Sequence, residues 1–489
     1  MGESLWIIDA IARETLLFAG VGLFIGGIDD LVVDLIFLVL RIRHGRRPKL
    51  TLATLPPSCG PGRIAVFVAA WDEVAVIGGM LATALDRYEH DDYRIYVGAY
   101  PNDPGTIAAV AAVAALDSRV RLVIGLRDGP TTKADCLNTL WHALRRDDAR
   151  EAVSTKAIVL HDAEDVVHAQ ELRVFDSLIG RYAVVQLPVL PLVHRGSRLV
   201  SGHYADEFAE SHAKQIVVRT ALGAGMPLAG TGCAIAPDIL ARIACARGGD
   251  PFDASSLTED YELGLRLAEL GAEGLFARVA ADDAGTVVAV RAYFPGTMTE
   301  SVRQKTRWMT GIALAGWDRT GWAPPRAFAD HWMRMRDRRA PLAVVVLAVA
   351  YVAMPVWGLS LLLHAVLGAA FPYVNEAHQA GMDTPLALTL FGANVALLGW
   401  RLAIRMLFTG RSYGVREAIW SLPRFVVGNL VALLAAPRAI LLYIRMLRGA
   451  APVWDKTRHE FPDLPPDAPD PIPEQDVASP GSGRAAIAG

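Results

Sequence analysis

Long apolar stretches lie near both ends of this 489-residue chain and are missing from its middle. Residues 16–40 form the first stretch, and residues 342–371 and 386–408 form two more. A helix of the 25 residues in the first stretch would be about 37 Å long, which exceeds the roughly 30 Å hydrocarbon core of a bilayer. The chain is therefore expected to cross a membrane and to fold a separate domain between its apolar ends.

Basic residues indicate which side of the membrane that domain faces. Arginines and lysines crowd residues 41–49, 334–339 and 401–416, whereas residues 372–385 contain neither. By the positive-inside rule, the basic flanks and the middle domain face the cytosol. Basic and polar residues also interrupt residues 425–444, and the apolar pieces that remain are too short to span. We expect an interfacial or re-entrant helix there, with a fourth span as the alternative.

The composition excludes several classes of protein. With 53% hydrophobic residues, 20% charged residues and a mean hydropathy of +0.30, the chain is not disordered as a whole. A net charge of −3 provides no basic field, so no nucleic-acid partner is expected. Four cysteines without close spacing exclude a disulfide framework and a Cys-based zinc site, and they suit a reducing cytosol.

The chain divides into four expected parts. Residues 1–49 form an N-terminal transmembrane helix with its basic flank, and residues 62–330 form a cytosolic domain. Residues 331–461 hold transmembrane and interfacial helices. Residues 462–489, rich in Pro, Ala, Asp and Gly, form a disordered tail.

Polar residues interrupt the first apolar stretch. Asp29, Asp30 and Asp34 are costly in a membrane, and we expect them to lie near an interface or to pair with arginines of neighbouring helices. A role in guiding a polar chain or a lipid phosphate is the alternative. Gly22 and Gly26 suit close helix packing.

In the middle of the chain, β-rich apolar runs alternate with helical patterns. Strands are expected at residues 64–70, 93–100, 120–126, 157–161 and 183–188, with helices such as 74–87 and 133–146 between them. This alternation predicts an α/β domain whose mostly parallel sheet is covered on both faces. Such sheets bind ligands at the carboxyl ends of their strands, and polar residues collect there.

Three acids follow one predicted strand: Asp162, Glu164 and Asp165. In an extended segment, side chains at i and i+2 point the same way, so Asp162 and Glu164 can converge on one Mg²⁺ or Mn²⁺. Such an ion bridges a diphosphate and stabilises it as a leaving group. A solvated turn or a helix cap is the alternative. His161 and His168 flank the acids, and we expect them to support the site rather than to bind the metal.

Thr258, Glu259 and Asp260 open a predicted helix. Thr258 could cap that helix, and acids in a first turn suit the helix dipole, so capping alone could explain the motif. In the functional interpretation, Asp260 is a general base that accepts a proton from an acceptor hydroxyl.

Gln304, Arg307 and Trp308 share one face of a further predicted helix, because they lie at i, i+3 and i+4. Arg307 can clamp a phosphate and Trp308 can stack on a sugar ring. An interfacial Arg–Trp pair beside a membrane domain is the alternative.

In this order, upstream of membrane helices, the three motifs resemble those of the membrane-bound family-2 glycosyltransferases, the group of cellulose, chitin and hyaluronan synthases. That group also has an acid pair near the first strands, which Asp72 and Asp103 match. Further phrases are similar to a bacterial subgroup, the phage adsorption protein B group, at residues 100–104, 133–138, 161–168 and 454–457. The resemblance covers roughly residues 63–408. It implies a cytosolic α/β sheet of the A-type glycosyltransferases, which binds a nucleotide sugar, plus α-helical transmembrane segments.

The resemblance implies roles for individual residues. Donor binding falls to Asp72, Glu73, Asp103, Lys133, Asp135 and Asp162, and the metal, Mg²⁺ or Mn²⁺, to Asp162 and Glu164. Acceptor binding falls to Gly230, Thr231, Gly232, Gln304 and Trp308. Asp260, with Glu259 and Arg307, is expected to catalyse a single in-line displacement that inverts the anomeric carbon.

The expected function is transfer of a sugar from a nucleoside-diphosphate sugar, most often a UDP-sugar, to a growing polysaccharide or a lipid-linked acceptor. The expected place is a bacterial inner membrane, crossed several times. Three spans make a thin channel, so an export or outer-membrane partner is expected if a polymer is secreted. The alternatives are transfer of one sugar to a polyprenyl phosphate and a non-catalytic scaffold in an envelope complex for polysaccharide export or phage adsorption. Relatives in the subgroup carry a cyclic-di-GMP-binding module, whose motif is missing from residues 462–489.

Overall fold

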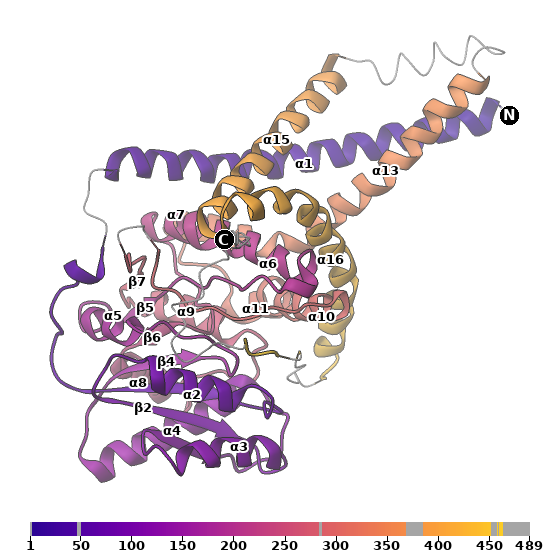
Figure 1. The fold of residues 1–489 in the computed structure, drawn as a ribbon. Helices are drawn as coiled ribbons and strands as arrows, with labels where there is room; N and C mark the ends of the chain where they lie inside the picture. Colours follow the sequence, from indigo (N-terminus) through magenta and orange to yellow (C-terminus); the bar gives the residue numbers. More distant parts are fainter. Residues whose placement is uncertain are drawn as a thin grey trace, which may run out of the picture.

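The computed structural model describes residues 2–45, 50–282, 286–367, 385–450, 457 and 459–462. A sheet flanked by helices forms one part of the molecule, and long helices lie on one side of it (Figure 1). In that view, α1 (Gly2–His44) runs across the top with α13 (Ala340–Leu367) beside its N-terminal part, and α15 (Pro385–Tyr413) crosses α1.

The sheet has seven strands in the order β3-β2-β1-β4-β6-β5-β7. Their bounds are β1 Arg63–Ala69, β2 Tyr93–Ala99, β3 Val120–Ile124, β4 Thr155–His161, β5 Val184–Gln186, β6 Cys233–Ile235 and β7 Gly274–Phe276. The first five confirm the five predicted strands. β6 runs antiparallel to both β4 and β5, whereas the other pairs are parallel. The sheet is therefore mixed, because β6 runs against both of its neighbours. No strand is predicted from the sequence at the three residues of β6.

Helices cover the sheet and continue toward the long helices. They are α2 Ile77–Arg87, α3 Pro104–Ala114, α4 Lys133–Glu151, α5 Glu171–Leu178, α6 Val200–Glu210, α7 Ile216–Ala221, α8 Pro237–Ala246, α9 Glu259–Glu269, α10 Met298–Trp308, α11 Ala315–Thr320, α12 Phe328–Arg338 and α16 Val415–Leu447. Short 3-10 turns lie at η1 (Leu52–Thr54) and η2 (Arg195–Ser197), and π-helical turns at η3 (Ser211–Gln215) and η4 (Met309–Leu314). The main core lies between β1, β2, β4 and helices α2 and α4, where apolar side chains are almost fully buried.

Among the described residues, three helices are long and apolar enough to cross a membrane: α13, α15 and α16. The predicted stretch 16–40 is one continuous helix within α1, but α1 is not among these three, so its membrane crossing stays a prediction.

The argument that residues 425–444 are too short to span is wrong. Arg424 interrupts the apolar run in sequence, yet its side chain is 1% exposed and turned into the protein, where it pairs with Glu417 and Asp206.

Glycines let α1 approach its neighbours closely. A Cβ at Gly22 would lie 2.7 Å from Val346 Cγ1 of α13, and one at Gly27 would lie 2.9 Å from Leu397 Cδ1 of α15. A Cβ at Gly26 would meet no described atom within 4 Å. The packing prediction is confirmed for Gly22 and is wrong for Gly26, because the helical rotation places Gly27 rather than Gly26 against α15.

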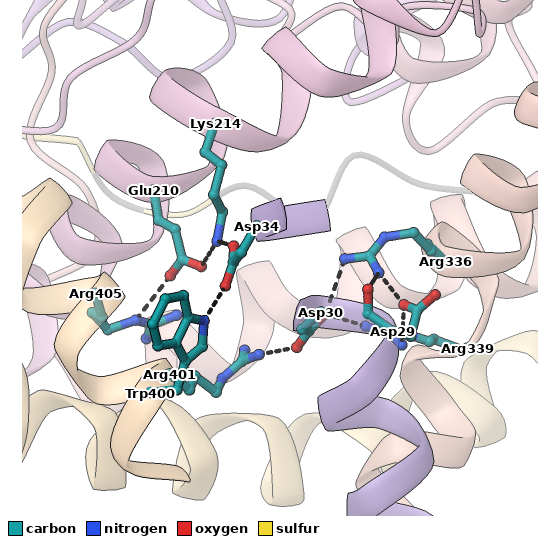
Figure 2. A network of polar contacts seen from close by, with 10 residues as sticks. All are labelled: Asp29, Asp30, Asp34, Glu210, Lys214, Arg336, Arg339, Trp400, Arg401 and Arg405. Carbon is teal, nitrogen blue, oxygen red and sulfur yellow. Dashed lines mark hydrogen bonds and ion pairs between the residues drawn. The ribbon is translucent and has the colours of Figure 1, made fainter. Parts of the chain in front are cut away.

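The acids of α1 pair with basic residues of other elements, as expected (Figure 2). Arg339 contacts Asp29 and Asp30 at 2.6 Å each, Arg336 also pairs with both acids, and Arg401 pairs with Asp30. Farther along α1, three residues hold Asp34 and Glu210. Lys214 pairs with both acids, Trp400 Nε1 donates to Asp34 at 2.8 Å, and Arg405 lies 3.3 Å from Glu210. The network ties α1 to α6, η3, the C-terminal end of α12 and α15.

Candidate active site

One cavity is lined by residues from all three sequence motifs. They are Lys133, Asp162, Glu164, Asp165, Thr231, Glu259, Asp260, Gln304, Arg307 and Trp308. Residues that are more than 100 positions apart in the chain thus meet at one place. Aromatic side chains that no motif predicted, among them Phe208, Tyr293 and Phe294, complete the lining.

Asp162 follows the end of β4 and is held by Lys133 at the start of α4. The Lys133 ammonium donates to Asp162 Oδ1 at 2.5 Å and to the carbonyl of Gly230 at 3.0 Å, and it lies 3.9 Å from Glu259. Burial works against the charge of Lys133, but the carboxylates of Asp162, Glu259 and Asp260 outweigh it and raise its pKa. Burial likewise opposes ionisation of Asp162, yet Lys133 lowers its pKa below the ordinary value. Both groups are therefore charged at neutral pH.

Beneath Asp162, His161 and Asp165 belong to a buried support. His161 Nδ1 lies 2.8 Å from Asp165 and its Nε2 lies 2.7 Å from Glu171. The Asp165 carboxylate also accepts the backbone N–H of Asp162 at 2.8 Å and contacts Thr231. Although burial disfavours the imidazolium, the two carboxylates raise the pKa of His161 to about 10. The expectation that His161 supports the acids is confirmed, and Asp165 is part of that support.

Asp260 lies in the first turn of α9, facing the Gly230–Gly232 segment. Gly230 has a φ of +74°, and a Cβ there would lie 2.7 Å from Asp260 Oδ2. Only glycine fits such a position without strain. Burial raises the pKa of Asp260, and the nearby Lys133 ammonium opposes that shift. Burial raises the pKa of the adjacent Glu259 to about 7.

Thr258 occupies the N-cap of α9, but the predicted capping bond is not made. The Thr258 hydroxyl is buried, and it has no hydrogen-bond partner among the described residues. Its side chain packs instead against Gly311 of η4, where a Cβ would lie 2.6 Å from Thr258 Oγ1. Capping alone therefore does not explain the Thr-Glu-Asp motif.

Helix α10 carries the third motif along one wall of the cavity. Gln304, Arg307 and Trp308 all line it, and the buried Gln304 Oε1 has no hydrogen-bond partner in the described part of the chain. Trp308 belongs to an aromatic group with Tyr204, Phe208 and Phe294, at ring-centroid distances of 5.9, 6.2 and 6.4 Å. A flat aromatic face with polar groups beside it suits a sugar ring.

The other predicted donor residues lie next to the cavity but outside its lining. Asp103 Oδ2 accepts the backbone N–H of Asp72 at 2.6 Å, and its Oδ1 accepts that of Thr106 at 3.2 Å, which caps α3. Asp135 pairs with Arg127. Asp72 and Asp103 are thus brought together as predicted, whereas Asp135 lies in the first turn of α4 and holds a neighbouring loop.

The structure adds a segment that sequence reasoning placed with the membrane helices and the tail. Thr457 and His459 line the cavity. His459 Nδ1 lies 2.9 Å from Glu73 Oε1 and 3.2 Å from Glu164 Oε2. The subgroup phrase at residues 454–457 was the available signal; Thr457 lines the cavity, and the other three residues lie outside the described part.

A group of residues that fits a divalent cation shares Glu164 with the predicted pair. Asp162 is engaged by Lys133, whereas ligand atoms of Glu73, Glu164 and His459 all lie within 4.8 Å of one another. Glu164 Oε2 is buried and makes no hydrogen bond within the described chain. Burial, together with Asp162, Glu73 and Asp165, raises the pKa of Glu164 to about 8 against the opposing effect of His459. Carboxylate oxygens are the ligands that Mg²⁺ and Mn²⁺ prefer.

Comparisons with known proteins show which family the chain resembles. The family described as "Glycosyltransferase like family 2" matches residues 61–311. Bacteriophage adsorption protein B of Escherichia coli (strain K12) and bacteriophage N4 adsorption protein B of Escherichia coli O157:H7 are each 32% identical over 486 residues. These matches cover 94% of this chain and 64% of the length of each relative.

Two solved structures are similar at lower identity. The mannosyltransferase PcManGT from Pyrobaculum calidifontis, in complex with GDP-Man and Mn²⁺, has a TM-score of 0.48 at 19% identity, covering 85% of this chain and 99% of that one. Glucosyl-3-phosphoglycerate synthase from Mycobacterium tuberculosis has a TM-score of 0.33 at 18% identity, covering 57% of this chain and 88% of that one.

The family match spans the whole mixed sheet, all three motifs and the cavity lining except Thr457 and His459. Three apolar helices long enough to cross a membrane follow it in the chain. The chain is a glycosyltransferase that belongs to family 2, with an A-type glycosyltransferase fold and three apolar helices long enough to cross a membrane among its described residues.

Proposed function

We propose that this protein transfers a sugar from a nucleoside-diphosphate sugar, with UDP as the first candidate nucleotide, to a growing polysaccharide or a lipid-linked acceptor. The observation that carries the proposal is the cavity itself: a charged Lys133–Asp162 pair, the buried Asp260 and the Arg307–Trp308 wall meet around one space. Each answers one need of glycosyl transfer, namely a site for the diphosphate, a base and a surface for the acceptor.

The proposed chemistry is a single displacement. Asp260 accepts the proton of the acceptor hydroxyl as that oxygen attacks the anomeric carbon from the side opposite the leaving diphosphate. Configuration is inverted because attack and departure occur on opposite faces. Lys133 and Arg307 offer positive charge to the diphosphate. A bound Mg²⁺ or Mn²⁺ supplies further charge stabilisation of that leaving group.

We place the reaction at the cytosolic face of a bacterial inner membrane. Three apolar helices and the arginines at their ends support this placement, because arginine-rich flanks face the cytosol. In this arrangement the donor comes from the cytosolic nucleotide-sugar pool and the acceptor is held at the lipid surface.

The test is UDP release by the purified full chain in lipid, with a panel of UDP-sugars and with Mg²⁺ or Mn²⁺. Release with one sugar, reduced about 10²- to 10⁴-fold in Asp260→Asn, is the expected result. Asp250→Asn is the matched control, because Asp250 is a surface acid paired with His142 and lies outside the cavity lining. A chain that binds UDP but transfers no sugar without added polyprenyl phosphate would indicate single transfer to that lipid. A chain that binds no UDP and releases none would contradict the UDP-sugar donor.

A further inference from the structure

One helical segment contacts both the active site and the long helix α1. Helices α6, η3 and α7 follow one another in the chain without a break. Phe208 and His212 share one face of this segment, with ring centroids 5.0 Å apart, and Glu210 and Lys214 share another, 2.8 Å apart. The members of each pair are four positions apart, and the pairs are offset by two positions, about 200° around a helix axis. The two pairs therefore point in nearly opposite directions.

The first pair supports the wall of the cavity. Phe208 lines the cavity, and its ring centroid lies 5.0 Å from that of Phe294 and 6.2 Å from that of Trp308. His212 Nδ1 accepts the backbone N–H of Val189, another lining residue, at 2.9 Å. Burial lowers the pKa of His212 to about 3, so its imidazole is neutral and can accept this bond. The segment thus fixes two parts of the lining.

The second pair belongs to the buried charge network (Figure 2). Lys214 reaches between Glu210 and Asp34 of α1, and its side chain is 4% exposed. Burial opposes ionisation of Glu210, yet Arg405 and Lys214 lower its pKa to about 2. Removing the lysine would leave two buried carboxylates short of a cation, and uncompensated buried charge is strongly destabilising.

The π-helical turn connects the two pairs. His212 and Lys214 both lie in η3, directly after the turn of α6 that carries Phe208. A π turn closes i→i+5 hydrogen bonds and is rare. Its conversion to an α-helix would rotate the side chains that follow it relative to those that precede it. The contacts of Lys214 with α1 therefore favour the turn that directs His212 at Val189.

We propose that Lys214 is a positioning residue, whose ion pairs with α1 and α6 hold η3 so that Phe208 and His212 keep this wall of the cavity in place. The wall adjoins Trp308, so its assignment to the acceptor rests on the proposed function. The diphosphate side is built from other elements, at Lys133 and Asp162. Acceptor binding, and not donor binding, should therefore depend on the contact with α1.

The experiment measures hydrogen exchange at single amides of the full chain in lipid, without ligands. Lys214→Met should make the Val189 amide exchange roughly tenfold or more faster, because loss of a buried ion pair favours local opening. Lys214→Arg keeps the charge and should restore the protection. Asp34→Asn breaks the same contact from α1 and should expose the same amide, which keeps the test decisive if Lys214→Met does not fold.

The matched control is Arg336→Met, because Arg336 pairs with Asp29 and Asp30 of α1 in the same network, outside η3. It should lower the thermal unfolding temperature and leave the Val189 amide protected. A Val189 amide that stays protected in both Lys214→Met and Asp34→Asn would overturn the proposal. Equal exposure in Arg336→Met would overturn it too, since any loosening of α1 would then suffice.

Kinetics provide the second measurement. In the UDP-release assay, with polyprenyl phosphate or an oligosaccharide of the donor sugar as acceptor, Lys214→Met should raise the acceptor KM about tenfold with kcat unchanged, the pattern of lost uniform binding. The KM for the UDP-sugar should not change. A donor KM that rises equally would overturn the assignment of this wall to the acceptor.

The two measurements separate this proposal from the proposed function. Exchange at Val189 that depends on Lys214, in a protein that transfers no sugar, would support the positioning role and not the transferase activity. Sugar transfer by a protein whose Val189 amide is indifferent to Lys214 would support the activity and overturn the positioning role.

Discussion

Lys133 and Asp260 share one electrostatic environment, and this determines how the proposed base should respond to pH. Asp260 can accept a proton only when it is ionised. Burial raises the pKa of Asp260 and the Lys133 ammonium opposes this shift. The net pKa is raised, because burial has the larger effect. The ordinary aspartate pKa of about 3.9 is the reference.

From this we predict that kcat falls as pH decreases through a value above the ordinary aspartate pKa. Lys133→Met should move this fall in kcat, the acid limb of the pH profile, to higher pH, since the substitution removes the positive charge that favours ionised Asp260. Lys156→Met is the control, because Lys156 pairs with Asp176 away from the cavity. Residual UDP release measured across pH gives the result, and a limb that stays in place or moves to lower pH contradicts the assignment.

The buried contacts of His161 should contribute to the free energy of unfolding. His161 is fully buried between Asp165 and Glu171, which are also almost completely buried. His161→Leu would leave two buried carboxylates without their cation, and removal of one partner from such a group costs about 3–5 kcal/mol of unfolding free energy. Denaturant or thermal unfolding in detergent measures this loss.

The comparison variant for that experiment is His142→Leu, whose pair with Asp250 is about half exposed. It should cost no more than about 1 kcal/mol. Equal losses in the two variants would show that the buried triad contributes no more than a surface pair.

Among the elements, α1 is attached by glycine contacts on one side and by ion pairs farther along. Gly22 lies against α13, whereas Gly26 meets no described atom within 4 Å. We therefore predict that Gly22→Leu separates α1 from α13 and lowers the thermal unfolding temperature, while Gly26→Leu changes it little. The two variants add the same side chain one helical turn apart, so helix propensity and hydrophobicity are matched.

Disulfide cross-linking between cysteines introduced into α1 and α13 provides an independent readout of the same contact. It should be weaker in Gly22→Leu and unchanged in Gly26→Leu. The opposite order would mean that α1 is rotated relative to the described packing.

For the whole molecule, the two exposed cysteines report the side of the membrane that the catalytic domain faces. Cys59 and Cys245 are exposed, and Cys136 and Cys233 are buried. If the domain is cytosolic, a membrane-impermeant maleimide should label a variant with Cys245 as its one cysteine in inside-out vesicles and not in right-side-out vesicles. A variant with Cys233 alone should be labelled in neither until it is denatured. Labelling of Cys245 only in right-side-out vesicles would contradict the cytosolic placement.

Much of the architecture could be predicted because it depends on local pattern. The first five strands and the position of α4 follow from apolar runs that neighbours in sequence determine. The three motifs could also be found, since each places its residues within a few positions of one another. The pairing of Asp29 and Asp30 with arginines followed from the cost of charge in an apolar helix.

Other features depend on residues far apart in the chain, and local pattern does not contain them. β6 is positioned by antiparallel pairing with β4 and β5. The Thr258 side chain packs against Gly311 of η4 and does not cap α9. The side chain of Arg424 counted against a membrane span in the sequence, but the fold turned it inward onto Asp206.

The amino-acid sequence alone was enough to establish the α/β domain and the apolar helices, because both rest on short-range periodicity, and its three motifs carried the resemblance to the family-2 glycosyltransferases. Only the tertiary structure placed Lys133 on Asp162, turned Asp165 into support for His161, and brought His459 to Glu73 across 386 positions of chain. Those contacts arise when the sheet and its helices close around a common core, and burial there decides which charges must find partners.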